Sequence, residues 1–90
     1  MIKKETLELS KQAIDRFGIR HELLKSVEEL SELTTVLMQF LNGKIVDLND
    51  IHSEIADVYI CLAHLYNIYV PSAIDDALET KQERLKDLLN

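Results

Sequence analysis

The chain has 90 residues, of which 47% are hydrophobic and 29% are charged, with only two glycines and one proline. This composition predicts one helical domain over residues 1–90 and excludes a disordered tail, while a formal charge of −6 disfavours binding to nucleic acid or to an anionic membrane. A lone chain of this length buries only roughly 60–65% of its extended surface, so we expect it to self-associate.

The spacing of apolar residues predicts helices, because strand-like alternation is missing and Leu, Glu, Lys and Ala are abundant. A first helix is expected over residues 6–17, with one apolar stripe, and Gly18 should end it. A second, plainly amphipathic helix is expected over residues 21–41, where apolar side chains recur every three or four positions, and Asn42-Gly43 should end it.

A third helix is expected to begin at a cap formed by Asn49 or Asp50 and to reach Tyr69. Its apolar residues occur on every side, and a helix of this kind is normally buried all round. A fourth helix should follow the proline and continue to the end of the chain, with Ser72 and Asp75 in an arrangement that resembles a capping box.

These elements indicate an all-α fold, a compact four-helix bundle that completes its core by oligomerisation. The connections are short, so the second and third helices should lie side by side and antiparallel. The third helix has more apolar surface than its neighbours can cover, which predicts that another copy of the chain covers part of it, in a homodimer at least.

The single cysteine, Cys61, excludes an intrachain disulfide and makes a reducing cytoplasm the expected location. The first ten residues lack the apolar segment of a signal peptide, and no apolar run reaches the roughly 18 residues of a membrane span. We therefore expect a cytoplasmic protein.

Two pairs of carboxylates stand out. Glu29 and Glu32 are three residues apart on the second helix, and Glu54 and Asp57 are three apart on the third, so each pair lies on one face of its helix. If the two helices are antiparallel neighbours, the pairs can face each other. Carboxylates among apolar residues require a counter-charge, because their desolvation costs several kcal/mol each.

Lys25, one turn before Glu29, neutralises only part of this charge, so the four carboxylates predict a site for a hard divalent cation. Mg²⁺ is the expected ion, and Mn²⁺ can substitute. A di-iron centre is disfavoured, because neither pair has a histidine at the fourth position. A single pair of this kind usually marks a solvated helix face. Two pairs on adjacent helices favour the metal site.

The pattern Glu-Glu-x-x-Glu at residues 28–32, a spacer of 21 residues, and Glu-x-x-Asp at 54–57 resembles the MazG-like superfamily of all-α nucleoside triphosphate pyrophosphohydrolases. That superfamily also includes dimeric dUTPases, dCTPases and phosphoribosyl-ATP pyrophosphohydrolase. The segments KSVEELSELTTVL and HSEIADVYICLAHL look like its two motif helices, and KQERLKDL is similar to the basic segment that often closes the domain.

The resemblance implies Mg²⁺-dependent hydrolysis of a nucleoside triphosphate between the α and β phosphates, with a deoxynucleotide or non-standard nucleotide as the expected substrate. It implies that Glu28 either completes a second metal site or orients and deprotonates the attacking water, and that Lys25 contacts phosphate oxygens. It also implies a dimer or tetramer with the site near the subunit interface. The implied metal ligands are Glu29, Glu32, Glu54 and Asp57.

Four other residues each have one functional and one structural interpretation. Lys81 and Arg84, three apart on the fourth helix, could clamp the triphosphate or belong to a solvated face. His64 could support the site or face phosphate, and Asn67 could hydrogen-bond a base. The structural alternatives are a satisfied core or interface histidine, which is favoured, and an asparagine bound to backbone.

Two rival functions remain open. Within enzymes, the substrate could be phosphoribosyl-ATP, or dUTP or dCTP alone. Outside enzymes, the chain could be a non-catalytic helical interaction module whose acidic residues decorate the surface, which predicts no effect of Mg²⁺ on stability.

Overall fold

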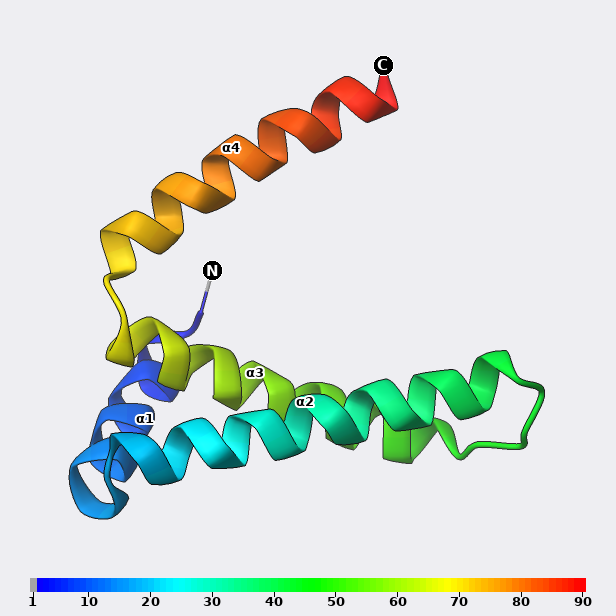
Figure 1. Ribbon diagram of the computed structural model, residues 1–90, viewed down its shortest axis with the longest axis horizontal. Coiled ribbons are helices and arrows are strands. Elements are labelled where there is room, and N and C mark those ends of the chain that lie inside the picture. The colour runs from blue at the N-terminus through cyan, green and yellow to red at the C-terminus, as the bar shows by residue number, and fades with distance from the viewer. Residues whose placement is uncertain (1) are drawn as a thin grey trace.

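The computed structural model describes residues 2–90, and in this part of the chain it contains helices and no strand. The prediction of an all-α chain with four helices is confirmed (Figure 1). None of the helices within residues 2–90 has both the length and the hydrophobicity needed to cross a membrane. The elements are α1 (Lys4–Phe17), α2 (Ile19–Leu41), α3 (Leu48–Ile68) and α4 (Pro71–Leu89).

The junction between α1 and α2 is a single residue, Gly18. Its φ of 94° lies in the left-handed region that favours glycine, and its N–H donates a hydrogen bond to the carbonyl of Ile14 (2.8 Å). Gly18 therefore ends α1 as expected, but α2 begins immediately afterwards at Ile19, two residues earlier than the sequence pattern suggests. The turn allows α1 to pack against both α2 and α3.

The second and third helices lie side by side and antiparallel, as expected, and form the most extensive contact between any two helices (Figure 1). The loop between them turns at Gly43, where φ is 82°. The cap of α3 is Asp47, whose carboxylate accepts a hydrogen bond from the N–H of Asn49 (2.8 Å). The prediction of a cap at Asn49 or Asp50 is wrong, because both residues already lie in the first turn of α3.

The start of α4 also differs from the expectation. Its N-cap residue is Val70 and makes no side-chain capping bond, so Ser72 and Asp75 do not form a capping pair. The carboxylate of Asp75 instead accepts the hydroxyl hydrogen of Tyr66 (2.7 Å), which joins the start of α4 to the last turns of α3.

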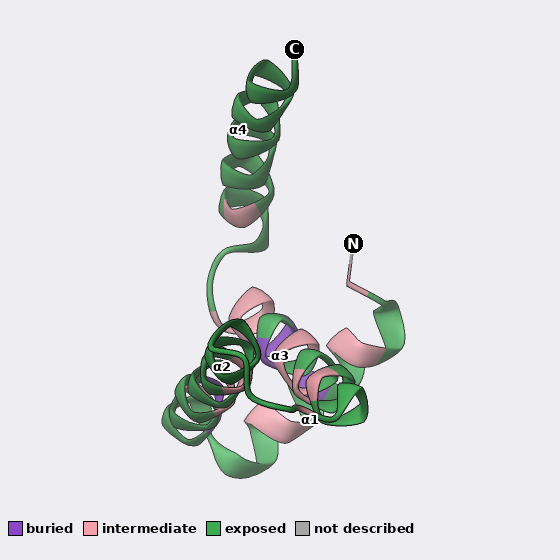
Figure 2. Ribbon diagram, turned by 90° about the vertical axis from the view of Figure 1, so that its right-hand side faces the viewer, coloured by how far each residue is buried: buried purple, intermediate pink, exposed green. Residues whose placement is uncertain are grey.

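Beyond this joint α4 extends away from the other helices (Figures 1 and 2). Ile74 is its one half-buried residue and the rest are exposed. The radius of gyration is 15.4 Å, against about 12 Å for a compact domain of this length. The single chain is therefore a three-helix core with a projecting fourth helix, and the expected compact packing of all four helices is not seen in it.

The centre of the three-helix core is largely polar. Because α4 projects, α3 is covered mainly by α1 and α2, and large apolar side chains such as Ile55, Ile60 and Leu62 remain about half exposed. The expectation that α3 is buried all round is not met in the single chain. The buried residues are Ser10, Glu22, Ser26, Cys61, Ala63 and His64.

Candidate functional site

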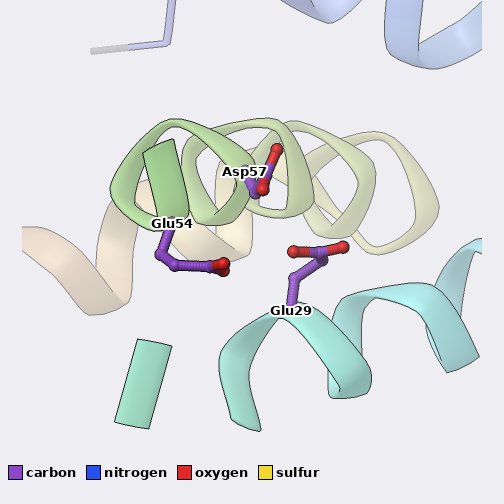
Figure 3. A group of neighbouring side chains, drawn as sticks. All are labelled: Glu29, Glu54 and Asp57. Carbon is purple, nitrogen blue, oxygen red and sulfur yellow. The ribbon is translucent and has the colours of Figure 1, made fainter. Parts of the chain in front are cut away.

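The antiparallel pairing of α2 and α3 brings the two acidic pairs together. Glu29 projects from α2 toward Glu54 and Asp57 of α3, into the space between the two helices (Figure 3). One carboxylate oxygen of each of these residues lies within 4.8 Å of the others, and all three side chains are half-buried. The two helices thus bring Glu29 next to a pair of carboxylates that lies 25 or more residues later in the sequence. We call Glu29, Glu54 and Asp57 the acidic cluster.

Glu32, the fourth expected ligand, lies at the edge of the acidic cluster. It is exposed, but it is close enough to Glu29 and Glu54 to act on the charge of both. An ionised carboxylate carries no hydrogen that it could donate to a neighbour, so Glu32 adds electrostatic repulsion to the acidic cluster.

Two oxygens of the acidic cluster have no partner. Within residues 2–90, Oε2 of Glu29 and Oε2 of Glu54 are buried and accept no hydrogen bond, and none of the ion pairs reaches them. An unpaired buried carboxylate oxygen is expensive, and native proteins pair such atoms with a donor or a cation.

The electrostatics of the cluster agree with this geometry. Burial raises the pKa of Glu29 above its ordinary value, and the neighbouring charges of Asp57, Glu32 and Glu54 raise it further. Burial likewise raises the pKa of Glu54, with Glu32 and Asp57 adding to the effect. Glu29 and Glu54 are therefore destabilised in their charged forms, and a bound cation would reverse this.

These features fit a hard divalent cation. All the candidate donors are carboxylate oxygens, which Mg²⁺ and Mn²⁺ accept, whereas the nitrogen and sulfur ligands typical of zinc are not part of the cluster. The two buried oxygens without partners are the observation that separates this cluster from an ordinary acidic surface.

A shallow groove on the surface of α2 and α3 begins at the acidic cluster. Glu54 belongs to both, and the groove is also lined by Glu32, at the edge of the cluster, and by Glu28, the expected catalytic residue. Asp50 also lines it and adds to the charge acting on Glu54, a role that sequence reasoning missed by treating it as a helix cap. Its spacing of four residues before Glu54 is the signal that could have found it. The remaining lining residues are Ser31, Thr35, Val36 and Gln39.

The expected phosphate-binding residues are not brought together. Lys25 is exposed on α2, one turn before Glu29, and forms no ion pair with a described residue. Lys81 and Arg84 lie on α4, which extends away from the acidic cluster of its own chain (Figure 1). Of these three residues, Lys25 alone lies on a helix that carries part of the acidic cluster.

His64 and Asn67 are used inside the core. Nδ1 of His64 lies 2.6 Å from Oγ of Ser10, and its Nε2 lies 3.1 Å from Oε2 of Glu22. The amide of Asn67 donates a hydrogen bond to the carbonyl of Leu7 (2.9 Å). Both residues are thus hydrogen-bonded within the protein, as their structural alternatives describe.

Comparisons with models of known protein families, with curated protein sequences and with solved structures found no match for this chain. The case for a function therefore depends on the residues and on their arrangement.

Proposed function

We propose that this chain is a Mg²⁺-dependent nucleotide pyrophosphohydrolase, which cleaves a nucleoside triphosphate to the monophosphate and pyrophosphate. The observation that carries the proposal is the acidic cluster, in which carboxylates from two helices converge and two buried oxygens have no partner. The resemblance of the paired motif to the MazG-like superfamily supports the reaction type, and a deoxynucleotide or non-standard nucleotide is the preferred substrate class.

Glu29, Glu54 and Asp57, together with Glu32 at the edge, would hold the ion. A bound Mg²⁺ would neutralise negative charge on the phosphate oxygens and acidify water next to them. This requirement is strong here, because a chain with a charge of −6 otherwise repels a triphosphate.

The chain's own residues then position the reactants. Glu28 is exposed on the wall of the groove, where its carboxylate is suited to orient a water molecule and to accept its proton as that water attacks phosphorus. Lys25, one turn before Glu29 on α2, would extend along the helix to contact phosphate oxygens. The pyrophosphate is the leaving group, so no covalent enzyme intermediate is needed.

We also propose that the active form is a homodimer or homotetramer in the cytoplasm. The half-exposed apolar residues of α3 and the projecting α4 support self-association, because such surface is usually covered by another chain. In such an assembly Lys81 and Arg84 would serve a neighbouring subunit's site rather than their own. The reduced state expected of Cys61, the single cysteine, is in keeping with the cytoplasm.

The decisive test is product analysis after incubation of the protein with Mg²⁺ and each of a panel of ribo- and deoxynucleoside triphosphates. Glu54→Gln is the inactive variant, and Glu8→Gln, an exposed residue on α1, is the matched control. We expect monophosphate and pyrophosphate from the wild type and from Glu8→Gln, but not from Glu54→Gln. The ranking of bases would then name the substrate.

Two other results have defined meanings. If no nucleotide is cleaved, phosphoribosyl-ATP is the remaining substrate to try. If the wild type is inert with that compound too, and Mg²⁺ leaves its thermal stability unchanged, the chain is not this enzyme and a helical interaction module becomes the better description.

A further inference from the structure

The interface between α2 and α3 is built in layers. From the groove inward, an acidic residue of α2 meets an acidic residue of α3 in the first two layers, a hydroxyl meets a thiol in the third, and a carboxylate meets an imidazole in the fourth. Each step moves three or four residues back along α2 and about the same number forward along α3, as antiparallel helices require. The layers are Glu32 with Glu54, Glu29 with Asp57, Ser26 with Cys61, and Glu22 with His64.

The fourth layer is the most highly constrained. Glu22 is 3% exposed, and both of its oxygens are engaged: Oε1 lies 2.8 Å from Nδ1 of His21, and Oε2 lies 3.1 Å from Nε2 of His64. The other ring nitrogen of His64 meets the hydroxyl of Ser10 on α1 (2.6 Å), and Ser10 is 2% exposed. A continuous chain of polar contacts therefore joins α1, α3 and α2.

Hydrogen-bonding capacity assigns the direction of these contacts. An ionised Glu22 carboxylate can only accept, so Nε2 of His64 must donate to it, and Nδ1 of a neutral ring must accept from the hydroxyl of Ser10. Burial lowers the pKa of His64, against the opposing effect of Glu22, which favours this neutral ring at pH 7. Every polar atom of the layer then has one partner.

We propose that Glu22 and His64 are positioning residues, which set the register of α2 against α3 and so hold Glu29 opposite Asp57. Seven residues separate Glu22 from Glu29, and seven separate Asp57 from His64, so the two layers are about 10 Å apart along the helices. The inference rests on the proposed metal site, because it assigns these residues a role in building that site.

The physical reason is that the intervening layer cannot define the register. Ser26 and Cys61 are small, and small side chains tolerate a shift of one helix along the other. Such a shift would leave Glu22 buried without His64, and removing one partner from a buried pair is strongly unfavourable. A single buried polar contact can specify register in paired helices for this reason.

The test uses Glu22→Gln, which keeps the shape of the side chain, and His64→Leu, which removes both hydrogen bonds of the ring. The matched controls are Glu8→Gln on α1 and His52→Leu on α3, because both positions are exposed. Binding of Mn²⁺ alone is measured from the paramagnetic resonance signal of the free ion. The register is measured separately in metal-free protein, from nuclear Overhauser contacts between the side chains of Ser26 and Cys61.

We expect both core variants to weaken Mn²⁺ binding by about tenfold or more, as is usual when residues that support metal ligands are lost. The Ser26–Cys61 contacts should weaken or move, while the helical circular dichroism remains and both controls match the wild type. If folded Glu22→Gln keeps the wild-type Mn²⁺ affinity and the wild-type contacts, the proposal is overturned.

The outcomes separate this inference from the proposed function. Failure of the wild type itself to bind Mn²⁺ would contradict the metal site, and the metal-free contacts would then decide the question of register. If His64→Leu does not fold, Glu22→Gln carries the test, because it changes one atom and leaves the volume of the core unchanged.

Discussion

At the scale of single residues, the carboxylates of the acidic cluster destabilise the metal-free folded state. Glu29 and Glu54 each bury a carboxylate oxygen that nothing within residues 2–90 pairs, and the charges of their neighbours repel them. Natural proteins tolerate such destabilising arrangements mainly at functional sites, where removing them raises stability and abolishes function. This trade-off can be measured here.

We predict that Glu29→Gln raises the unfolding temperature of the metal-free protein, because it removes one mutually repelling carboxylate. The variant should also lose at least about 100-fold in turnover. Loss of residues that only support the metal ligands already costs up to about 100-fold, and loss of a ligand itself should cost at least as much. Thermal unfolding in EDTA and product analysis with Mg²⁺ check the two parts, with Glu8→Gln as the control. An unfolding temperature below that of the wild type would show that the carboxylates do not repel one another.

The same residues predict how pH acts on the metal-free protein. The pKa values of Glu29 and Glu54 are raised above the ordinary 4.5, so these groups bind protons more tightly in the folded state than in the unfolded chain. The stability that these two groups contribute is therefore fully present below pH 4.5 and is lost as pH rises through the raised pKa values. His64 acts in the opposite direction, because its pKa is lowered from 6.5 and its contribution is lost as pH falls.

Urea unfolding in EDTA between about pH 4 and 8 separates these contributions when the wild type is compared with the double variant Glu29→Gln/Glu54→Gln. His64 is common to both proteins, so their difference reports the two glutamates. We expect the double variant to gain stability relative to the wild type as pH rises. A difference that does not vary with pH would contradict the raised pKa values.

At the scale of helices, the ends are set by short-range interactions that the sequence only partly reveals. Gly18 was recognisable as a helix end, because a positive φ favours glycine. The start of α3 was placed at Asn49 or Asp50, whereas Asp47 provides the cap. Asp47, Asn49 and Asp50 are all of types that can cap a helix. Once Asp47 accepts a hydrogen bond from a free N–H at the helix start, the two later residues lie inside the first turn and no longer occupy the cap position.

We predict that Asp47→Ala lowers the free energy of unfolding by about 1 kcal/mol, because it removes the hydrogen bond to the N–H of Asn49. Asn49→Ala is the matched control and should change stability little, since its side chain does not cap the helix. Both variants are compared by urea unfolding. Equal losses in the two variants would show that the cap lies elsewhere.

At the scale of the whole molecule, α4 is the unusual element. It projects from the core (Figure 2). It also exposes an apolar stripe that includes Leu78, Leu85 and Leu88, which are 52%, 55% and 82% exposed. The basic residues Lys81 and Arg84 lie on this same helix. Under the proposed function, a second copy of the chain would cover this stripe and receive these basic residues.

We predict that Leu78→Gln/Leu85→Gln converts the protein to a monomer of 10.4 kDa, measured by light scattering after size exclusion. The matched control is Glu79→Gln/Glu83→Gln, which changes the other faces of α4. We expect the leucine variant also to lose turnover, because the proposed site receives Lys81 and Arg84 from the neighbouring subunit. A wild type that is monomeric at the concentrations of the activity assay would refute the predicted assembly.

The four helices and the two acidic pairs were readable from the sequence, because both depend on local spacing. The 3.6-residue period places Glu29 beside Glu32 and Glu54 near Asp57 on any straight helix, whatever the fold around them. The short loop between α2 and α3 then leaves an antiparallel pair as the simplest arrangement, so the convergence of the two pairs could be anticipated before the structure.

The tertiary structure alone decided which polar residues became core and where the last helix went. Ser10, Glu22 and His64 come from three helices, and no local pattern shows that they meet, since contacts across such separations depend on how whole faces pack. Asp50 joined the groove for the same reason. The direction of α4 depends on the conformation of the two residues between α3 and α4 and on the apolar surface that α4 can bury. The apolar period of a single helix determines neither of these.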